Sequence, residues 1–236
     1  MRIVNLGNRV VNTYLVELAH GWLLIDTGYP GGFSRFMRKM KKNRIDPDDI
    51  KIIFLTHAHD DHAGFLNELL GCCDAKVVVS KQAIEGLRRG QNCFDGGCTG
   101  TLSLWFCRLM KLFGKGKHTY PPVEHMYEHR YIYPEAVSQK ELPGQIIETP
   151  GHTKCSLSLL LDNGFLFCGD AAMNGFPSTR RLSIWAEDIG AYTAAWEKIV
   201  TLQPAMIYPG HGKPFPVSDL KRYLPGIRQT KLLRLK

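Results

Sequence analysis

Residues 56–62 (Thr-His-Ala-His-Asp-Asp-His) place three imidazoles and a carboxylate ligand within six positions, directly after the apolar run Ile-Ile-Phe-Leu of residues 52–55. Imidazole and carboxylate are ligands that suit zinc and its divalent first-row neighbours. A polar loop whose histidines cap a helix would account for one histidine in a turn, but not for four ligand-type side chains at this spacing. The segment therefore predicts a catalytic metal site at the end of a buried strand.

The spacing of these side chains allows them to converge. If residues 51–55 form a strand, His57 and His59 can project to the same side of the extended segment that follows. If a helix then begins, His59 and His62 are three positions apart and also converge. Asp61 and His62 would in that case face a second ion that His57 and His59 do not share.

Three later side chains stand in equivalent settings. His152 in Thr-Pro-Gly-His-Thr and His211 in Tyr-Pro-Gly-His-Gly each follow a short apolar run and a Pro-Gly pair, which indicates a strand entering a tight turn. Asp170 follows Phe-Cys-Gly at a similar strand end. With the first four, these side chains make seven candidate ligands, enough for two ions with an open position.

With its ligands in this order, the chain resembles the metallo-β-lactamase superfamily, whose hallmark is His-x-His-x-Asp-His followed by a later His, an Asp and a last His. The matching residues are His57, His59, Asp61, His62, His152, Asp170 and His211. The early Leu-Ile-Asp-Thr-Gly of residues 24–28 is also similar to the superfamily's first strand and turn, so the resemblance covers about residues 3–215. It implies an α/β fold, the four-layer αββα sandwich of that superfamily.

The resemblance also implies how the ligands divide between two ions. The first ion would be held by His57, His59 and His152, the second by Asp61, His62 and His211, and both by Asp170. Asp26 would accept a hydrogen bond from a ligand imidazole and fix its tautomer, although a turn aspartate explains this residue equally well. We expect both ions to be zinc, with iron or manganese as alternatives.

The rest of the sequence has the pattern of one α/β domain, expected to span residues 1–236 because no linker or internal repeat is visible. Strands are predicted near residues 3–6, 12–18, 22–25, 51–55, 75–80, 145–148, 156–161, 165–168 and 205–208. Helices are predicted near residues 33–42, 81–89 and 189–201, with a further one through residues 69–70. An irregular insert at about residues 90–143 is the expected substrate region.

The insert contains an apolar cluster between residues 102 and 113, flanked by Arg108, Lys111, Lys115 and Lys117. This cluster could cover the metal cleft and receive an apolar substrate tail, lie on a membrane surface, or pack as an insert helix or dimer contact; we favour packing or dimerisation. Later in the insert stand His118, His125 and His129, any one of which could protonate a leaving group. Cys93 and Cys98 could form a metal knuckle or a disulfide loop, but without a second paired motif free thiols are expected.

Composition limits the partners and the compartment. No apolar run of 18 or more residues and no secretory signal are visible, so we expect a cytoplasmic protein without stable membrane insertion. The formal net charge of +8 invites a nucleic-acid interpretation, but a solvated basic tail explains much of it, and the superfamily's nucleases usually carry a large inserted domain. We therefore expect no nucleic acid, a small-molecule substrate with an apolar or anionic part, and a homodimer as an open possibility. Arg180, Arg181 and Lys154 are candidate anchors for an anionic substrate.

The predicted function is that of a metal-dependent hydrolase in which a metal-bridging hydroxide cleaves an ester, lactone or thioester bond of a small molecule. Asp61 is the predicted catalytic residue, because a ligand on the open side could orient the nucleophile and carry a proton. A quorum-signal lactonase is disfavoured, since Ala171, Ala172 and Met173 follow Asp170 where such lactonases often carry a tyrosine.

Three alternative functions stay open. The first is a phosphodiesterase on a small or nucleotide substrate, which the basic balance would suit. The others are an iron-dependent oxidoreductase and a non-enzymatic binding protein. Both of these are disfavoured because the seven-ligand set is intact.

Overall fold

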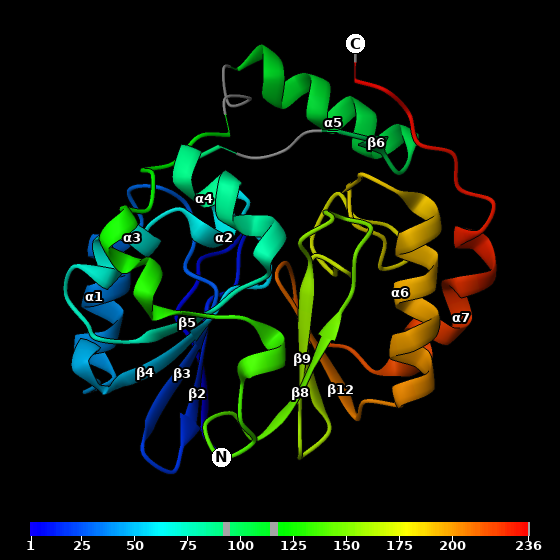
Figure 1. Cartoon of the computed structure of the whole chain (residues 1–236). Coiled ribbons are helices and arrows are strands. Elements are labelled where there is room, and N and C mark those ends of the chain that lie inside the picture. Colours follow the sequence, from blue (N-terminus) through cyan, green and yellow to red (C-terminus); the bar gives the residue numbers. More distant parts are fainter. Residues whose placement is uncertain (92–94, 114–117, 236) are drawn as a thin grey trace. The chain divides into compact units, whose positions relative to one another are not determined.

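The computed structural model describes residues 1–91, 95–113 and 118–235, which form two compact units (Figure 1). Unit 1 comprises Met1–Asn92 and His118–Ser138, and unit 2 comprises Cys93–Lys117 and Gln139–Lys236. The insert expected at about residues 90–143 is therefore divided between the two units. A single domain over the whole chain stays a prediction.

Unit 1 is built on a six-stranded mixed sheet in the order β1-β2-β3-β4-β5-β7. Its strands are β1 (Ile3–Asn5), β2 (Tyr14–Leu18), β3 (Gly21–Ile25), β4 (Ile50–Phe54), β5 (Lys76–Val78) and β7 (Tyr131–Ile132). The first three strands pair antiparallel and the others join in parallel. Strand β4 lies between β3 and β5 and is almost wholly buried, as is typical of a parallel strand covered on both faces.

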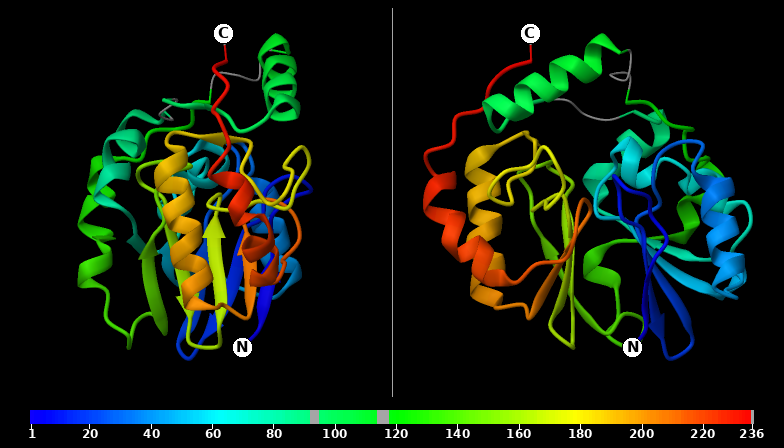
Figure 2. Two further views of the ribbon diagram at one scale, coloured as in Figure 1. Left: turned by 90° about the vertical axis from the view of Figure 1, so that its right-hand side faces the viewer. Right: turned by 180° about the vertical axis from the view of Figure 1, so that it is seen from behind.

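The helices of unit 1 are short and follow the strands. They are α1 (Phe33–Lys42), α2 (Asp60–Ala63), α3 (Leu66–Leu70) and α4 (Ile84–Arg89), with the 3₁₀ turns η1 (Pro47–Asp49), η2 (Lys81–Ala83), η3 (His125–Arg130) and η4 (Pro134–Ala136). Helix α1 lies along the sheet (Figure 2) and buries Phe36 and Met40, which are four positions apart on one helical face. Its last turn carries Lys39, Lys41 and Lys42, whose positive charges interact favourably with the helix dipole. Lys41 and Lys42 are exposed, whereas Lys39 is half-buried and donates to the carbonyls of Leu6 and Gly7.

Unit 2 contains a four-stranded mixed sheet in the order β12-β10-β9-β8 and a two-stranded ribbon. The sheet strands are β8 (Gly144–Glu148), β9 (Leu157–Leu161), β10 (Phe165–Gly169) and β12 (Met206–Pro209), and the ribbon pairs β6 (Gly97–Cys98) with β11 (Trp185–Ala186). Strand β9 is antiparallel to β8 and to β10, whereas β12 is parallel to β10. Strands β8, β10 and β12 therefore run in one direction and end at the same edge of the sheet.

Three helices complete unit 2: α5 (Thr101–Leu112), α6 (Ile189–Leu202) and α7 (Val217–Ile227). Helices α6 and α7 are neighbours (Figure 1). The core between helices and sheet includes the fully buried Trp196, Tyr192 and Leu220. Asp188 caps the N-terminus of α6: its carboxylate accepts the backbone N–H groups of Gly190 and Ala191 at 2.7 and 2.9 Å.

The long predicted elements are present, with ends that differ by a few residues. The basic C-terminal segment, expected to be a solvated tail, instead forms α7, which buries Leu220 and Ile227. The insert, expected to be irregular, contains the regular helix α5. Cys98 forms no disulfide within the described part of the chain, and Cys93 lies outside it. Among the described helices, none is both long enough and apolar enough to cross a bilayer.

Candidate metal centre

The ends of four strands carry the predicted ligands. In unit 1, β4 ends at Phe54, and the next eight residues contain the predicted ligands His57, His59, Asp61 and His62. In unit 2, one ligand follows each of β8, β10 and β12, in this order: His152, Asp170 and His211. Side chains beyond the carboxyl ends of strands meet at one sheet edge, which is where α/β folds commonly bind ligands.

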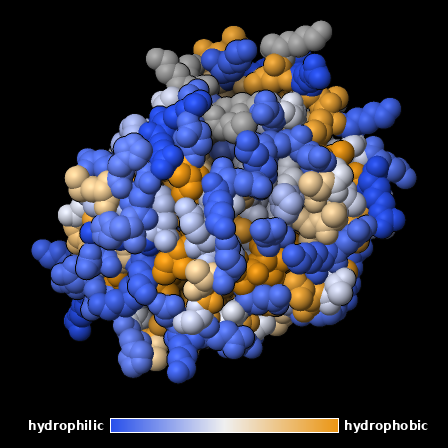
Figure 3. All heavy atoms as spheres, viewed as in Figure 1, coloured by the Kyte–Doolittle hydropathy of each residue, from blue (hydrophilic) through white to orange (hydrophobic). Residues whose placement is uncertain are grey.

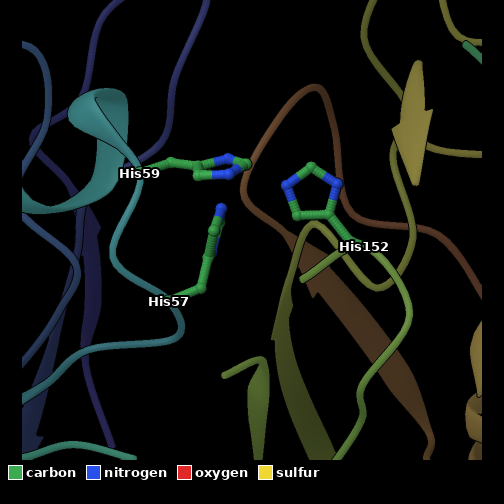
Figure 4. Close-up of side chains that lie close together, drawn as sticks. All are labelled: His57, His59 and His152. Carbon is green, nitrogen blue, oxygen red and sulfur yellow. The ribbon is translucent and has the colours of Figure 1, made fainter. Parts of the chain in front are cut away.

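Within unit 1 the three histidines form one buried cluster. The ring centroids of His57 and His59 are 4.6 Å apart and those of His57 and His62 are 4.1 Å apart. Figure 4 shows the ring of His57 directed toward that of His59. Helix α2 begins after His59, as the sequence predicts, and brings His62 back toward the cluster, where its Nε2 lies 3.7 Å from Asp61 Oδ1.

Asp26 fixes the orientation of two of these imidazoles. Its carboxylate accepts the Nδ1–H of His62 at 2.8 Å and both the backbone N–H and the hydroxyl of Thr56 at 2.7 Å. Because the Thr56 hydroxyl donates to Asp26, its oxygen accepts the Nδ1–H of His57 at 3.0 Å. Both rings therefore hold their proton on Nδ1 and present Nε2 as the ligand atom. The hydrogen bond expected between Asp26 and a ligand imidazole is present.

The backbone around Asp26 strengthens this arrangement. Asp26 has φ +57°, a left-handed conformation that aspartate tolerates better than most residues. The next residue, Thr27, donates both its backbone N–H and its hydroxyl to the His62 carbonyl, at 2.7 and 2.8 Å. The turn after β3 thus binds the side chain and the main chain of His62.

Unit 2 brings its three predicted ligands together in the same way. Asp170 Oδ2 lies 3.6 Å from His152 Nε2 and 3.4 Å from His211 Nε2, and all three residues are buried. The Nδ1–H of His152 donates to the Trp185 carbonyl at 2.8 Å, and the Ser183 hydroxyl lies 3.1 Å from the same nitrogen. His152, which Figure 4 labels on the turn after β8, therefore also presents Nε2 as its ligand atom.

Gly151 explains why this turn can approach helix α6 so closely. It has φ +130°, and a Cβ atom at this position would lie 2.3 Å from the backbone N and Cα of Tyr192. Its carbonyl accepts the backbone N–H groups of Glu187 and Asp188, at 2.8 and 3.1 Å. The Pro-Gly-His motif is therefore a packing requirement of the site as well as a turn signal.

The distances between ligand atoms fit metal coordination. Two donors bound tetrahedrally at zinc–ligand distances of about 2.0–2.1 Å lie roughly 3.3–3.4 Å apart. The carboxylate–imidazole separations of 3.4, 3.6 and 3.7 Å are close to this value and longer than an ordinary hydrogen bond. The nitrogen and oxygen donors suit zinc, iron and manganese alike. The His and Asp clusters are thus consistent with a binuclear metal site.

Sequence reasoning did not identify three groups that orient the predicted ligands: Thr56 in unit 1, and Ser183 and the Trp185 carbonyl in unit 2. Thr56 immediately precedes the motif, so its position offered a signal. Ser183 and the Trp185 carbonyl are more than thirty positions from His152 and offered none, because a backbone acceptor leaves no mark in residue type.

The structure separates the three histidines of the insert. His118 Nδ1 lies 3.3 Å from Asp60 Oδ1, beside the ligand loop of unit 1. His125 is exposed and contacts Glu128 at 2.6 Å, and His129 is exposed and contacts the Met126 carbonyl at 2.5 Å. Of the three, His118 is the one placed next to the loop.

Arg181, a predicted anchor for an anionic substrate, has a structural role. Its guanidinium donates two hydrogen bonds to Asp219, at 2.7 and 2.8 Å, and a third to Asn174. It also lies 4.9 Å from the ring centroid of Phe215. Lys154 and Arg180 are exposed.

The sequence matches the family described as the Metallo-beta-lactamase superfamily over residues 6–211. Probable metallo-hydrolase YflN of Bacillus subtilis is 28% identical over 170 residues, which are 70% of this chain and 62% of that protein. Probable metallo-hydrolase MJ0888 of Methanocaldococcus jannaschii is 26% identical over 222 residues, covering 86% of this chain and 87% of that protein. Thioesterase pkgB of Emericella nidulans is 28% identical over 203 residues, covering 85% of this chain and 45% of that protein. The chain thus spans about three fifths of the length of YflN and less than half of pkgB.

Solved structures show the same fold at low sequence identity. The Rm3 metallo-beta-lactamase superposes with a TM-score of 0.64 at 18% identity, covering 95% of this chain and 87% of that one. ST1585 from Sulfolobus tokodaii, an archaeal protein of the superfamily, gives a TM-score of 0.61 at 20% identity, covering 100% and 88%. Two mixed sheets flanked by helices match these structures, which confirms the predicted fold class.

Proposed function

Because the chain belongs to the metallo-beta-lactamase superfamily, we propose that it is a binuclear metallo-hydrolase that cleaves an ester or thioester bond of a small molecule. The observation that carries the proposal is the complete set of ligands, gathered in one cluster per unit. Within these clusters, hydrogen bonds that fix Nδ1 direct the Nε2 atoms of His57, His62 and His152 to act as ligands. Side chains prepared in this way fit metal binding better than a purely structural role.

We propose the ligand division that the family implies. The first ion is assigned to His57, His59 and His152, the second to Asp61, His62 and His211, and Asp170 is shared. When bound, two divalent ions supply a nucleophile at neutral pH and a Lewis acid for the scissile carbonyl.

The chain's own residues supply the orientation. Asp61, about one sixth exposed, is the least buried side chain among the ligands, so it is placed to orient the nucleophile and hold its proton. Asp26 and Thr56 keep the ligand rings fixed during the reaction. His118, beside Asp60, is the candidate donor of a proton to the leaving group.

Both the relatives and the residues that follow Asp170 favour an acyl substrate that is not a quorum-signal lactone. The similarity to a thioesterase supports an acyl substrate, and the metallo-hydrolase relatives support hydrolysis. Ala171, Ala172 and Met173 are buried and carry no hydroxyl, so this segment offers no group like the tyrosine frequent in lactonases. A phosphodiester substrate is less well supported, because Arg181 is already bound by Asp219 and Asn174.

The test is turnover by the fully metallated protein at neutral pH. We expect hydrolysis of an S-acyl glutathione or a medium-chain acyl ester, and slow or no hydrolysis of bis(p-nitrophenyl) phosphate. Asp61→Ala should lose about one metal equivalent and most of the activity, whereas Asp60→Asn, one position away, should keep both metals. Full activity and full metal content in Asp61→Ala would contradict the proposal, as would turnover of the phosphodiester alone.

A further inference from the structure

Helix α5 presents an apolar strip to solvent. Leu102, Trp105, Leu109 and Leu112 recur at helical spacing and share one face, and Trp105 and Leu112 are 69% and 83% exposed. A strip of this kind on an otherwise polar surface marks an interaction site more often than ordinary packing.

The opposite face of α5 attaches the helix to unit 2. Ser103 is buried on that side, and the helix packs against strand β6. Phe106, on the flank between the two faces, contacts the ring of Phe176, with centroids 6.4 Å apart in an edge-to-face arrangement. The outward strip is therefore not needed to hold the helix. Phe176, itself 83% exposed, adds an apolar ring next to Phe106. In the space-filling view, apolar side chains reach the surface among polar ones in the region where Figure 1 places α5 (Figure 3).

The charge next to the strip has a single sign. Arg108 is exposed beside the strip and Lys111 is exposed one turn further along, farther round the helix; neither forms an ion pair with any residue that the structure describes. Residues 96–123 contain four cations and no aspartate or glutamate; two of the four, Lys115 and Lys117, fall outside the described residues. The C-terminal segment adds exposed Lys231 and Arg234 on either side of Leu233, whose backbone pairs with Cys98 of β6 at 2.8 Å.

We propose that the outward face of α5 binds the surface of a membrane that contains anionic lipids. Apolar side chains with a tryptophan, bordered by arginine and lysine, are the composition of a helix that lies in the lipid–water interface. At 12 residues α5 is about 18 Å long, too short to span a bilayer but long enough to lie in its plane.

Charge complementarity selects the lipid surface over a second copy of the chain. A symmetric contact through this face would bring Arg108 and Lys111 of two copies together, and α5 offers no carboxylate to pair with them. Lipid phosphates would neutralise these cations while the acyl boundary receives Trp105 and Leu109. The contact is peripheral and reversible, and it does not depend on the proposed hydrolase activity.

The experiment is co-sedimentation of the full chain with phosphatidylcholine vesicles that contain or lack phosphatidylglycerol. We expect binding to the anionic vesicles and roughly 30-fold weaker binding when Arg108→Gln and Lys111→Gln are combined, at about fivefold for each cation. Trp105→Ser with Leu109→Ser should weaken binding about tenfold or more. Two matched controls should bind like the unmodified chain: Lys41→Gln with Lys42→Gln, which removes the same charge from α1, and Met126→Ser, which removes an exposed apolar side chain from η3.

Tryptophan emission locates the contact. Of the four tryptophans, Trp22 and Trp196 are buried and Trp185 is half-buried, whereas Trp105 is exposed, so vesicle binding should shift mainly the emission of Trp105 to shorter wavelength. Trp105→Phe should keep most of the binding and lose the shift. The proposal is overturned if anionic vesicles do not bind the chain, if the shift persists in Trp105→Phe, or if light scattering shows a dimer that Trp105→Ser with Leu109→Ser converts to a monomer.

Discussion

At the scale of single residues, the orientation of the proposed ligands depends on a few atoms that are not proposed ligands themselves. The Asp26 carboxylate accepts hydrogen bonds from three donors, the Nδ1–H of His62 and two groups of Thr56. Asp26→Asn exchanges one accepting oxygen for a donor, so at least one of these bonds is lost and the rings of His57 and His62 are no longer fixed. We expect metal affinity to fall about 10- to 100-fold, measured by competition with a chromophoric chelator.

The matched control for this substitution is Asp162→Asn, which makes the same chemical change at an exposed turn residue. It should leave metal affinity unchanged. Equal affinity in Asp26→Asn and Asp162→Asn would show that Asp26 does not orient the ligands.

Gly151 allows a prediction about stability. Gly151→Ala places a methyl group 2.3 Å from the Tyr192 backbone at a residue with φ +130°. We expect the free energy of unfolding to fall by about 2–4 kcal/mol, measured by urea denaturation. The matched control is Gly31→Ala. Gly31 has φ +74°, and no atom lies within 4 Å of the added Cβ, so this substitution introduces backbone strain without a clash. It should lower the free energy of unfolding by only about 1 kcal/mol.

At the scale of elements, an ion pair joins α4 to η3. Glu128 accepts two hydrogen bonds from Arg88, each of 2.8 Å, and one from His125 at 2.6 Å. These partners, Arg88 foremost, lower the pKa of Glu128 to about 2. Because the folded-state pKa is depressed, the stabilisation is present above the unfolded-state pKa of about 4.3 and is lost as the pH falls toward 2.

The comparison that checks this is Glu128→Gln against the unmodified chain in urea. The variant should unfold at a slightly lower midpoint at pH 7, and the difference should shrink below about pH 4. Salt should reduce the difference as well, since the pair is partly exposed. A difference that stays constant from pH 7 to pH 2 would rule out a contribution of the charge.

The element scale also shows what sequence patterns could predict. The strands β4 and β10 were predictable because burial makes almost every residue in them apolar. Helix α1 was predictable because burial of one face gives its apolar residues a helical period. The two-residue strands β6, β7 and β11 are too short to carry any period. Helix α7 escaped prediction because its surface is basic and Pro225 interrupts its helical pattern.

At the scale of the whole molecule, metal binding should contribute to the stability of the fold. Ligands bound only by the folded state stabilise it by mass action, by about 2.7 kcal/mol for each ion at a hundred times its dissociation constant. Removing metal with a chelator should therefore lower Tm by about 5–10 °C or more, and adding zinc should restore it. In Asp61→Ala, the chelator should lower Tm by less, because this variant has one ion fewer to lose. Identical Tm values of the unmodified chain with and without metal would exclude metal binding at the proposed ligands.

The Asp26 network has a further consequence for how the ions are acquired. Asp26 holds His62 directly and His57 through Thr56, and the proposed assignment gives these two imidazoles to different ions. Hydrogen bonds orient both rings but leave them residual motion. The first ion to bind would restrict its own imidazole further and, through the shared carboxylate, the other one as well, so the second ion would lose less conformational entropy on binding. Loading would then be cooperative. Native mass spectrometry during a zinc titration should show apo and doubly loaded protein, with the singly loaded form scarce throughout.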